Sequence, residues 1–289
     1  MKPSALYLPS VALFILVLSQ PAAASWPGDA GRIVFQGKRD GHSVLLTMSP
    51  AGRRVRRVTD LHRSEASGGF SPDGRRIVFV RSFKGNQYDI STIQVDGSHL
   101  ERLTFRDARD LDPSWSPDGK QIVYSREGAI RGTFDLFAMD SDGSNKTQIT
   151  STEEREFHPF WSPDGDSIAY IQGNTGLCTI DADGSNRSVV ARWAQEADWS
   201  PDGDSFVVEG NGPDGAGIYS VDEVGAVVTP VLLEAGWFNP IWAPSGDKIA
   251  ALKFFGDGEL GIYVMNPDGS ERKLIRPTSV IAPFSWQAR

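Results

Sequence analysis

The sequence predicts an all-β protein, a six-bladed β-propeller whose blades are four-stranded antiparallel sheets. Three observations support this prediction. A turn motif recurs at a nearly constant interval, the segments after each turn are rich in strand-forming residues, and no segment keeps a helical hydrophobic stripe over three turns. The 289 residues, 39% of them hydrophobic, are enough for one large domain or two small ones.

The repeated motif is an aromatic residue followed by Ser-Pro-Asp-Gly, as in WSPDGKQIVYS at residues 115–125. Proline presets its own φ, aspartate can hydrogen-bond the turn backbone, and glycine supplies the left-handed conformation that returns the chain. The β-branched and aromatic residues that follow predict a strand. The aromatic positions are spaced by 45, 46, 38 and 43 residues, which is the period of a propeller blade. They are Phe70, Trp115, Trp161, Trp199 and Trp242.

Each repeat contains four predicted strands, A to D. In the second repeat these are DPSWS, QIVYS, DLFAMD and TQIT. Glycine turns such as SDGSN join strand C to strand D. Strands B and C are apolar on both faces, which predicts that a neighbouring sheet packs on each side of every blade.

The two ends of the chain predict how the ring closes. Trp286 follows Trp242 by 44 residues, but no strands B to D come after it. Residues 31–60 supply strands B, C and D without a strand A, so pairing the two ends completes a sixth blade and removes two exposed edges. One domain is expected over residues 25–289, with blades at about 66–105, 111–150, 157–191, 196–234 and 238–276, and a split blade from 31–60 and 281–289.

The first 24 residues have the pattern of a secretory signal peptide. Lys2 precedes an apolar stretch that is densest over residues 11–18, and Ala22, Ala23 and Ala24 form a small-residue cleavage site before Ser25. The stretch is short for a membrane span. We therefore expect a periplasmic or secreted protein with no stable membrane span after cleavage, the alternative being an uncleaved anchor.

Charge and cysteine content limit the partners and the chemistry. A formal net charge of −8 and a pI near 5.1 argue against a nucleic-acid partner, which would require a basic face. The single cysteine, Cys178, cannot form an intramolecular disulfide and is expected to be a buried thiol. Neither a cofactor nor a metal is expected.

At these repeats the sequence resembles the TolB-type β-propellers, which are built from PD40 repeats of the WSPDG and LT pattern. The resemblance covers about residues 31–287, and no counterpart of the separate domain that precedes the propeller in TolB is expected. It implies a monomeric, non-catalytic docking scaffold in the bacterial envelope with a protein or peptide partner. Some PD40 propellers are fused to serine peptidases, but the G-x-S-x-G motif is absent.

An enzyme remains the alternative function. Polysaccharide lyases built on related propellers suggest a metal-assisted lyase or hydrolase acting at the mouth of the central channel. Three histidines map to the same end of the propeller, namely His42, His62 and His158. No short-range metal-binding spacing connects them.

Strand order places the A–B and C–D turns at one end of the disc and the D–A and B–C loops at the other, where the variable sequence predicts recognition. Acidic residues ahead of the A strands are expected to form a ring at the channel mouth that binds a cation or a basic peptide. The alternative is a solvated loop set that keeps the protein soluble. If the ring binds such a partner, neutralising Asp110, Asp112, Glu156 and Asp198 together is expected to leave the fold intact, because like charges in one ring repel each other. The ring consists of Glu65, Asp110, Asp112, Glu156, His158, Glu196 and Asp198.

Aromatic residues fall in the same loops. Trp193, Trp237 and Phe238 are expected at the rim as exposed interface anchors, with blade packing as the alternative for some of them. Phe83, Phe254 and Phe255 lie in or next to the B–C loops and belong to the same set.

Overall fold

The computed structural model describes residues 31–39, 42–60, 65–83, 87–105, 109–255, 260–278 and 284–286. The predicted signal peptide lies outside the described residues. Within these ranges the secondary structure consists of β-strands, and no helix is long and apolar enough to cross a membrane.

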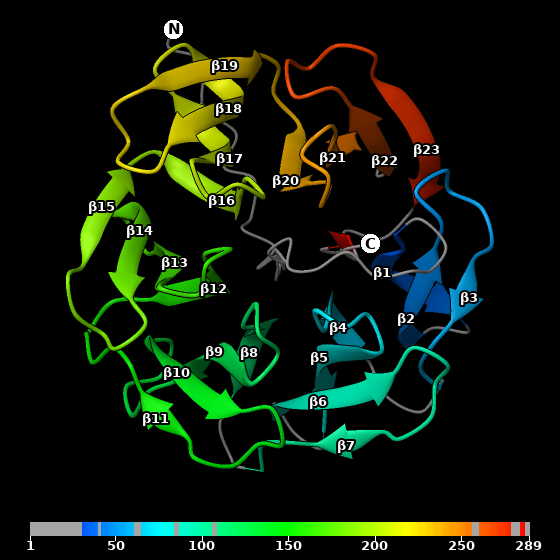
Figure 1. Cartoon of the computed structure of the whole chain (residues 1–289), viewed down its shortest axis with the longest axis vertical. Helices are drawn as coiled ribbons and strands as arrows, with labels where there is room; N and C mark the ends of the chain where they lie inside the picture. The colour runs from blue at the N-terminus through cyan, green and yellow to red at the C-terminus, as the bar shows by residue number, and fades with distance from the viewer. Residues whose placement is uncertain are drawn as a thin grey trace, which may run out of the picture.

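Six four-stranded antiparallel sheets surround one axis, and Figure 1 shows their radial arrangement. The innermost strands are β4 (Glu65–Phe70), β8 (Asp110–Trp115), β12 (Glu156–Trp161), β16 (Ala194–Trp199), β20 (Trp237–Trp242) and β24 (Phe284–Trp286). The second strands are β5 (Arg76–Ser82), β9 (Gln121–Glu127), β13 (Ser167–Gln172), β17 (Ser205–Gly212), β21 (Ile249–Phe254) and β1 (Ile33–Arg39). The predicted six-bladed propeller is confirmed.

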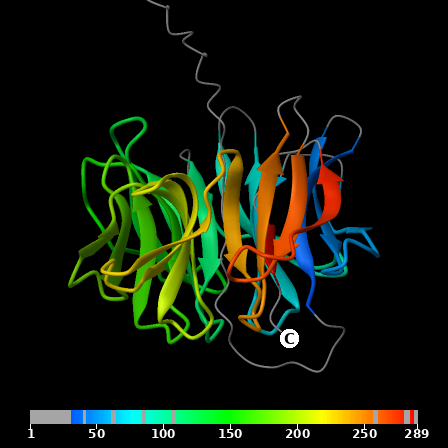
Figure 2. The same ribbon diagram turned by 90° about the horizontal axis from the view of Figure 1, so that it is seen from above.

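The third and fourth strands complete each blade toward the outside of the disc, which Figure 2 shows edge-on. The third strands are β6 (Tyr88–Gln94), β10 (Phe134–Asp140), β14 (Gly176–Asp181), β18 (Gly215–Asp222), β22 (Leu260–Met265) and β2 (His42–Met48). The outermost strands are β7 (Glu101–Arg102), β11 (Thr147–Gln148), β15 (Ser188–Ala191), β19 (Val228–Leu232), β23 (Lys273–Thr278) and β3 (Arg56–Arg57). The blades are numbered one to six, starting from β4 and ending with the split blade.

The split blade closes as predicted. Strand β24 pairs antiparallel with β1, with Trp286 opposite Ile33 and Phe284 opposite Phe35. The first described strand and the last therefore lie in one sheet, in the order β24-β1-β2-β3. The pairing covers backbone edges of β1 and β24 that an open ring would leave without strand partners.

The hydrophobic core is divided into six clusters, each of which lies between two neighbouring blades. Alternate residues of one strand enter different clusters, because successive side chains of a strand point to opposite faces. On β9, Ile122 and Tyr124 pack toward blade one while Val123 packs toward blade three. The predicted packing on both faces of the second strand is confirmed.

The repeated Ser-Pro-Asp-Gly turns join the first two strands and also touch the preceding blade. In blade two, the Ser116 hydroxyl donates to Asp118 Oδ1 at 2.7 Å and accepts from the Gln121 amide at 2.9 Å. In blade three, Gly165 has a φ of 83°, and a Cβ there would lie 3.1 Å from Pro117 Cγ of the preceding turn. Only glycine meets both the conformational and the spatial requirement without strain.

We expect loss of β24 to destabilise the whole ring, since its removal exposes an edge of β1 and opens the blade five–blade six core. Deleting residues 284–289 should cost several kcal/mol against a typical total of roughly 5–15 kcal/mol. Thermal melting and light scattering should show early unfolding or aggregation. Deleting residues 287–289 alone keeps β24 and is the control; similar melting temperatures for the two truncations would show that this strand does not close the ring.

We also expect the large inter-blade aromatics to be core residues. Trp161 is 3% exposed and packs against Val123 and Leu136 of the preceding blade. Changing Trp161 to Ala should cost about 3–5 kcal/mol in chemical denaturation, and Trp237→Ala should cost as much, because its indole is 5% exposed. Phe105→Ala is the control, since that ring is 67% exposed. Near-zero loss at Trp237 would contradict its core placement.

Candidate functional site

Three carboxylates of the predicted acidic ring lie at the first residue of an inner strand and are buried. Asp110 accepts two hydrogen bonds from the Arg126 guanidinium, at 2.7 and 2.9 Å. Glu65 lies 3.2 Å from Arg81 Nε and accepts a 3.0 Å hydrogen bond from the Thr59 hydroxyl. Glu156 accepts hydrogen bonds from Thr152 at 3.1 Å and from Thr150, whose hydroxyl also accepts from the Leu136 amide of blade two. Thr59 in the same way accepts from the Leu45 amide of blade six. Asp110 is therefore paired within its own blade, whereas Glu65 and Glu156 also connect their inner strands to the preceding blade.

The expectation of solvated ring charge is therefore wrong for Glu65, Asp110 and Glu156. Each is at most 1% exposed. Removing one partner from a buried ion pair typically costs about 3–5 kcal/mol, because the other charge loses its compensation. The expectation that neutralising several ring carboxylates leaves the fold intact consequently does not hold for Asp110.

The inner strands also contain bulges close to the axis. Three bulge residues have positive φ, Asp112 at 54°, His158 at 51° and Asn239 at 51°, and each directly precedes a proline. Asp, Asn and His are the non-glycine residues that enter this region most readily. The strand ladder is interrupted there, so the bulge residues leave the regular alternation of side chains.

Four side chains from blades two to four form a group that we call the central polar cluster, namely Asp112, His158, Glu196 and Glu209. His158 Nδ1 lies 3.0 Å from Glu196 Oε2, and Nε2 lies 3.8 Å from Asp112 Oδ2. The His158 backbone amide donates to the same Asp112 oxygen at 3.1 Å. Glu209 on β17 stands opposite Glu196 on β16. The imidazole therefore connects three blades through two carboxylates.

Burial raises the pKa of the carboxylates in this cluster. Desolvation raises the pKa of Asp112 and of Glu196, and in both cases the neighbouring His158 opposes part of that rise. Desolvation, together with the charge of Glu196, raises the pKa of Glu209 to about 8. Chemically, the cluster can hold or pass a proton and can tie blades together. In the part of the chain that the structure describes, no group of three His, Cys, Asp or Glu residues is arranged to hold a metal ion.

Two further polar residues lie on inner strands, Asp198 on β16 and Asn239 on β20. Asp198 Oδ2 accepts a 2.8 Å hydrogen bond from the Trp242 backbone amide and so connects blades four and five. Asn239 is 1% exposed, and neither its Nδ2 nor its Oδ1 has a hydrogen-bond partner among the described residues. An unsatisfied buried amide costs about 1–3 kcal/mol. Asn239 is thus the one member of the bulge series whose side-chain polar atoms are both unpartnered in the described structure.

The rim aromatics are packed rather than exposed, so their expected placement as free interface anchors is wrong. Trp237 lies in the core between blades four and five, and its ring meets Tyr263 edge-on with centroids 5.1 Å apart. Trp193 meets Tyr219 edge-on at 4.9 Å, and Phe238 packs against the core between blades five and six. The alternative of blade packing applies to all three.

Apolar side chains are nevertheless exposed in the loops of the predicted recognition end. Those loops contain five of the nine large hydrophobic residues that are exposed in the described structure, namely Phe105, Ile130, Leu233, Phe254 and Phe255. Phe105 and Leu233 lie in D–A loops, Ile130 lies in a B–C loop, and Phe254 and Phe255 lie where β21 ends. Exposed apolar groups on a soluble protein often mark contact surfaces.

Comparison with known proteins agrees with this architecture. The TolB beta propeller domain, PD40, matches residues 17–132. The Tol-Pal system protein TolB of Anaeromyxobacter dehalogenans is 33% identical over 97 residues, which are 34% of this chain and 21% of that protein. The crystal structure of TolB from Acinetobacter baumannii has a TM-score of 0.71 at 19% identity and covers 91% of this chain and 68% of its own.

A likeness in fold alone extends to an enzyme. An oligogalacturonate lyase in complex with manganese has a TM-score of 0.56 at 14% identity, covering 87% of this chain and 75% of that one. The repeats and the six closed blades define a β-propeller. Its residues 17–132 are similar to the TolB beta propeller domain, and the segment aligned with the curated TolB spans about a fifth of that protein.

Sequence reasoning missed Asn239 and Glu209. Asn239 has a sequence signal, because NPIW at residues 239–242 has the same form as DPSW at 112–115 and HPFW at 158–161. Glu209 directly follows the apolar run FVV of β17. The residues at the same position in blades three and five, Ile171 and Leu252, are apolar and also pair with the inner strand. The repeat identifies such positions, but contacts between blades depend on the closed ring.

We expect stability to depend on pH through Glu209. Its pKa is raised from 4.5 to about 8 in the folded protein, so folding favours the protonated carboxyl. That contribution is complete below pH 4.5 and is lost as the pH rises through 8. In thermal melts, Glu209→Gln should match the wild type near pH 4.5 and become progressively more stable than it toward pH 9.

Glu223→Gln is the matched control for this series, because Glu223 is an exposed glutamate in a turn of the same blade. It should leave the pH profile of the melting temperature unchanged. A constant offset between Glu209→Gln and wild type over the whole range would contradict the raised pKa.

Proposed function

We propose that the protein is an exported, non-catalytic scaffold of the bacterial cell envelope that binds a protein or peptide partner. The TolB-type propeller supports this proposal, because the matched relative is a Tol-Pal system protein. Export is supported by the signal-peptide pattern of residues 1–24. Location in the periplasm or outside the cell is part of the proposal, as is a monomeric state.

The observation that carries the proposal is the gathering of exposed apolar residues at the end formed by the D–A and B–C loops. By their positions in the fold, Phe105 and Ile130 lie in loops of blades one and two, and Leu233, Phe254 and Phe255 lie in or next to loops of blades four and five. Blades two and five face each other across the axis in Figure 1. A partner lying over this end of the disc would contact both groups.

Phe254 and Phe255 are the strongest anchor candidates. They are 42% and 46% exposed, and buried aromatic side chains supply much of the free energy in protein interfaces. Lys253 next to them forms a 2.7 Å ion pair with Glu234 across the loops, which holds the end of β21 in place. The aromatic pair thus projects from an ordered support, so binding requires little additional ordering of the described backbone.

The polar residues of the inner strands have a different role in this proposal. Asp110 is paired within its blade, Glu65 and Glu156 also bond threonines of the preceding blades, and the central polar cluster connects blades two to four. Their burial removes the reason for assigning the predicted ring to direct ligand contact. The likeness to the lyase concerns the fold only, and no second function is proposed.

We expect the double variant Phe254→Ser, Phe255→Ser to lose the partner in a pull-down from an envelope extract, because the exposed rings no longer offer apolar area to bury. Loss of an aromatic anchor typically costs about 2 kcal/mol or more, which lowers affinity about thirtyfold. Quantitative mass spectrometry of the captured proteins is the readout.

The matched control is Val224→Ser, Val227→Ser, which removes exposed apolar groups from the opposite end of the disc. Those valines are 69% and 60% exposed and lie in the C–D turn of blade four. A protein captured by wild type and by the control, but not by the phenylalanine variant, supports the proposal. Equal capture by all three, with unchanged melting temperatures, contradicts this surface as the binding site.

A further inference from the structure

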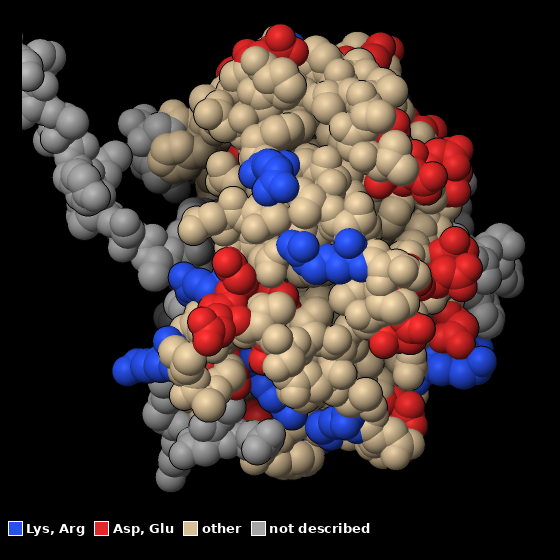
Figure 3. Space-filling model, turned by 90° about the vertical axis from the view of Figure 1, so that its left-hand side faces the viewer, with Lys and Arg blue, Asp and Glu red and all other residues tan. Residues whose placement is uncertain are grey.

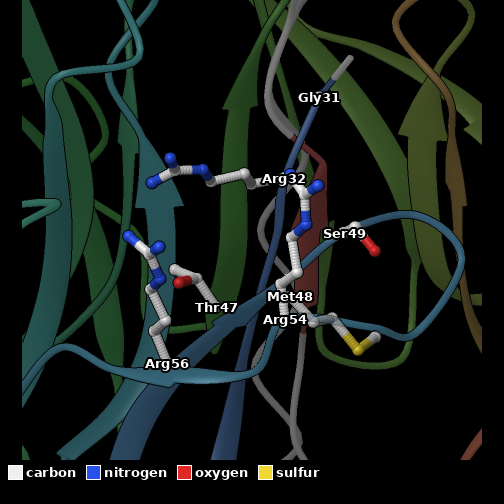
Figure 4. Close-up of a pocket in the computed structure, with 7 residues that line it drawn as sticks. All are labelled: Gly31, Arg32, Thr47, Met48, Ser49, Arg54 and Arg56. Carbon is white, nitrogen blue, oxygen red and sulfur yellow. The ribbon is translucent and has the colours of Figure 1, made fainter. Parts of the chain in front are cut away.

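A small cavity opens in blade six at the end of the disc that contains the A–B and C–D turns. Its volume is about 60 Å³. Its lining includes three arginines, Arg32, Arg54 and Arg56, and two hydroxyl residues, Thr47 and Ser49. Figure 4 shows that the three arginine side chains come from three separate segments and extend around the same space.

The backbone of the blade holds these segments in place. Arg56 on β3 pairs with Thr47 on β2, and Arg32 immediately precedes Ile33, which pairs with Met48. Arg54 lies in the C–D turn with a φ of 56°. Strand pairing therefore brings the bases of these side chains together, whatever their individual rotamers.

The other blades show what this turn normally contains. In blade two the first turn residue is Asp140, whose carboxylate accepts a 2.7 Å hydrogen bond from Asn145. In blade three Asp181 and Asn186 make the same contact at 2.7 Å. The backbone bonds across the turn place Ser49 and Arg54 at the corresponding positions of blade six. Blade six therefore has the Ser49 hydroxyl in place of the aspartate carboxylate and the Arg54 guanidinium in place of the asparagine amide.

The remaining two arginines extend this contrast. Arg32 and Arg56 occupy the positions of Gln121 and Thr147 in blade two and of Ser167 and Ser188 in blade three. Blades two and three each have one negative charge at these four positions, whereas blade six has three positive charges there. Exposed aspartates of the turns make the same end acidic elsewhere, and Figure 3 shows acidic side chains along one edge of the side opposite blade six.

No acidic residue lines the cavity. Within the described ranges, neither Arg32 nor Arg56 forms an ion pair or a side-chain hydrogen bond with another residue. Like charges around one small space repel each other, and their field attracts an anion. Ser49 Oγ accepts a 3.1 Å hydrogen bond from the Arg53 amide, so its own proton can be donated to a ligand.

We propose that this cavity binds a phosphate group. Planar guanidinium groups donate paired hydrogen bonds to oxyanions, so the Arg32 and Arg56 guanidiniums, with the positive charge of Arg54 and two hydroxyls beside them, match a tetrahedral group better than a two-oxygen carboxylate. A volume of about 60 Å³ corresponds to roughly two water molecules, which suits one small ion or the end group of a larger molecule. The chemistry is shared by free phosphate and by a phosphate monoester.

The test is isothermal titration calorimetry of the chain from residue 25 onward with inorganic phosphate, and separately with glycerol phosphate. The ionic strength is kept constant with chloride. We expect saturable binding of phosphate, and loss of one guanidinium in Arg56→Gln should weaken it about tenfold. Tighter binding of the ester than of free phosphate assigns the site to an end group, and equal binding assigns it to the free ion. Absence of saturable binding of both probes overturns the proposal.

Two further variants separate the cavity from general basic charge. Ser49→Asp restores the carboxylate present at Asp140 and Asp181, and it should abolish phosphate binding while the turn still forms. Arg53→Gln removes an exposed arginine of the same turn that does not line the cavity, and it should bind phosphate like the wild type. Melting temperatures in chloride verify that each variant is folded. If Ser49→Asp binds phosphate as wild type does, or Arg53→Gln weakens binding as much as Arg56→Gln, the site is not this cavity.

Discussion

Apolar packing between neighbouring blades is the interaction on which the rest of this structure depends. Each of the six core clusters needs residues from two blades, so no blade buries its hydrophobic faces alone. Burial of apolar area is the main favourable term in folding. A blade that is apolar on both faces buries this area fully only when a neighbouring blade packs on each side. The pairing of β24 with β1 completes blade six, so that every blade has two neighbours.

Polar contacts specify how the packed blades meet. The ion pair between Arg126 and Asp110 lies within blade two. His158 of blade three instead contacts Asp112 of blade two and Glu196 of blade four. Such contacts bury charge, and their net contribution to stability is small compared with the cost of breaking them. The carboxylates near the axis therefore belong to the scaffold, although their type and position in the chain suggested a binding ring.

The two ends of the disc consequently offer different chemistry. The D–A and B–C loops present exposed apolar side chains such as Phe254 and Phe255, which suit a protein surface. The opposite end is shaped by tight turns with aspartates in most blades and by an arginine cavity in blade six. Because antiparallel strands alternate direction, the D–A and B–C loops and the A–B and C–D turns lie at opposite ends, and each end can vary without changing the core.

The repeat alone determined the fold, down to the split blade, because a turn such as WSPDG and the strand after it are local and their spacing sets the size of the blade. The site was predicted only in part. The sequence placed Asp110, His158 and Trp237 near the axis or in the adjoining loops. Their partners come from the folded structure, Arg126 of the same blade for Asp110 and side chains of neighbouring blades for His158. The exposure of Phe254 and the contact from His158 to Glu196 were decided by tertiary structure, because they depend on blade packing that no single repeat contains. The meeting of Arg32 with Arg56 was decided by strand pairing within blade six, which sets the side-chain neighbours that the turn motif alone does not specify.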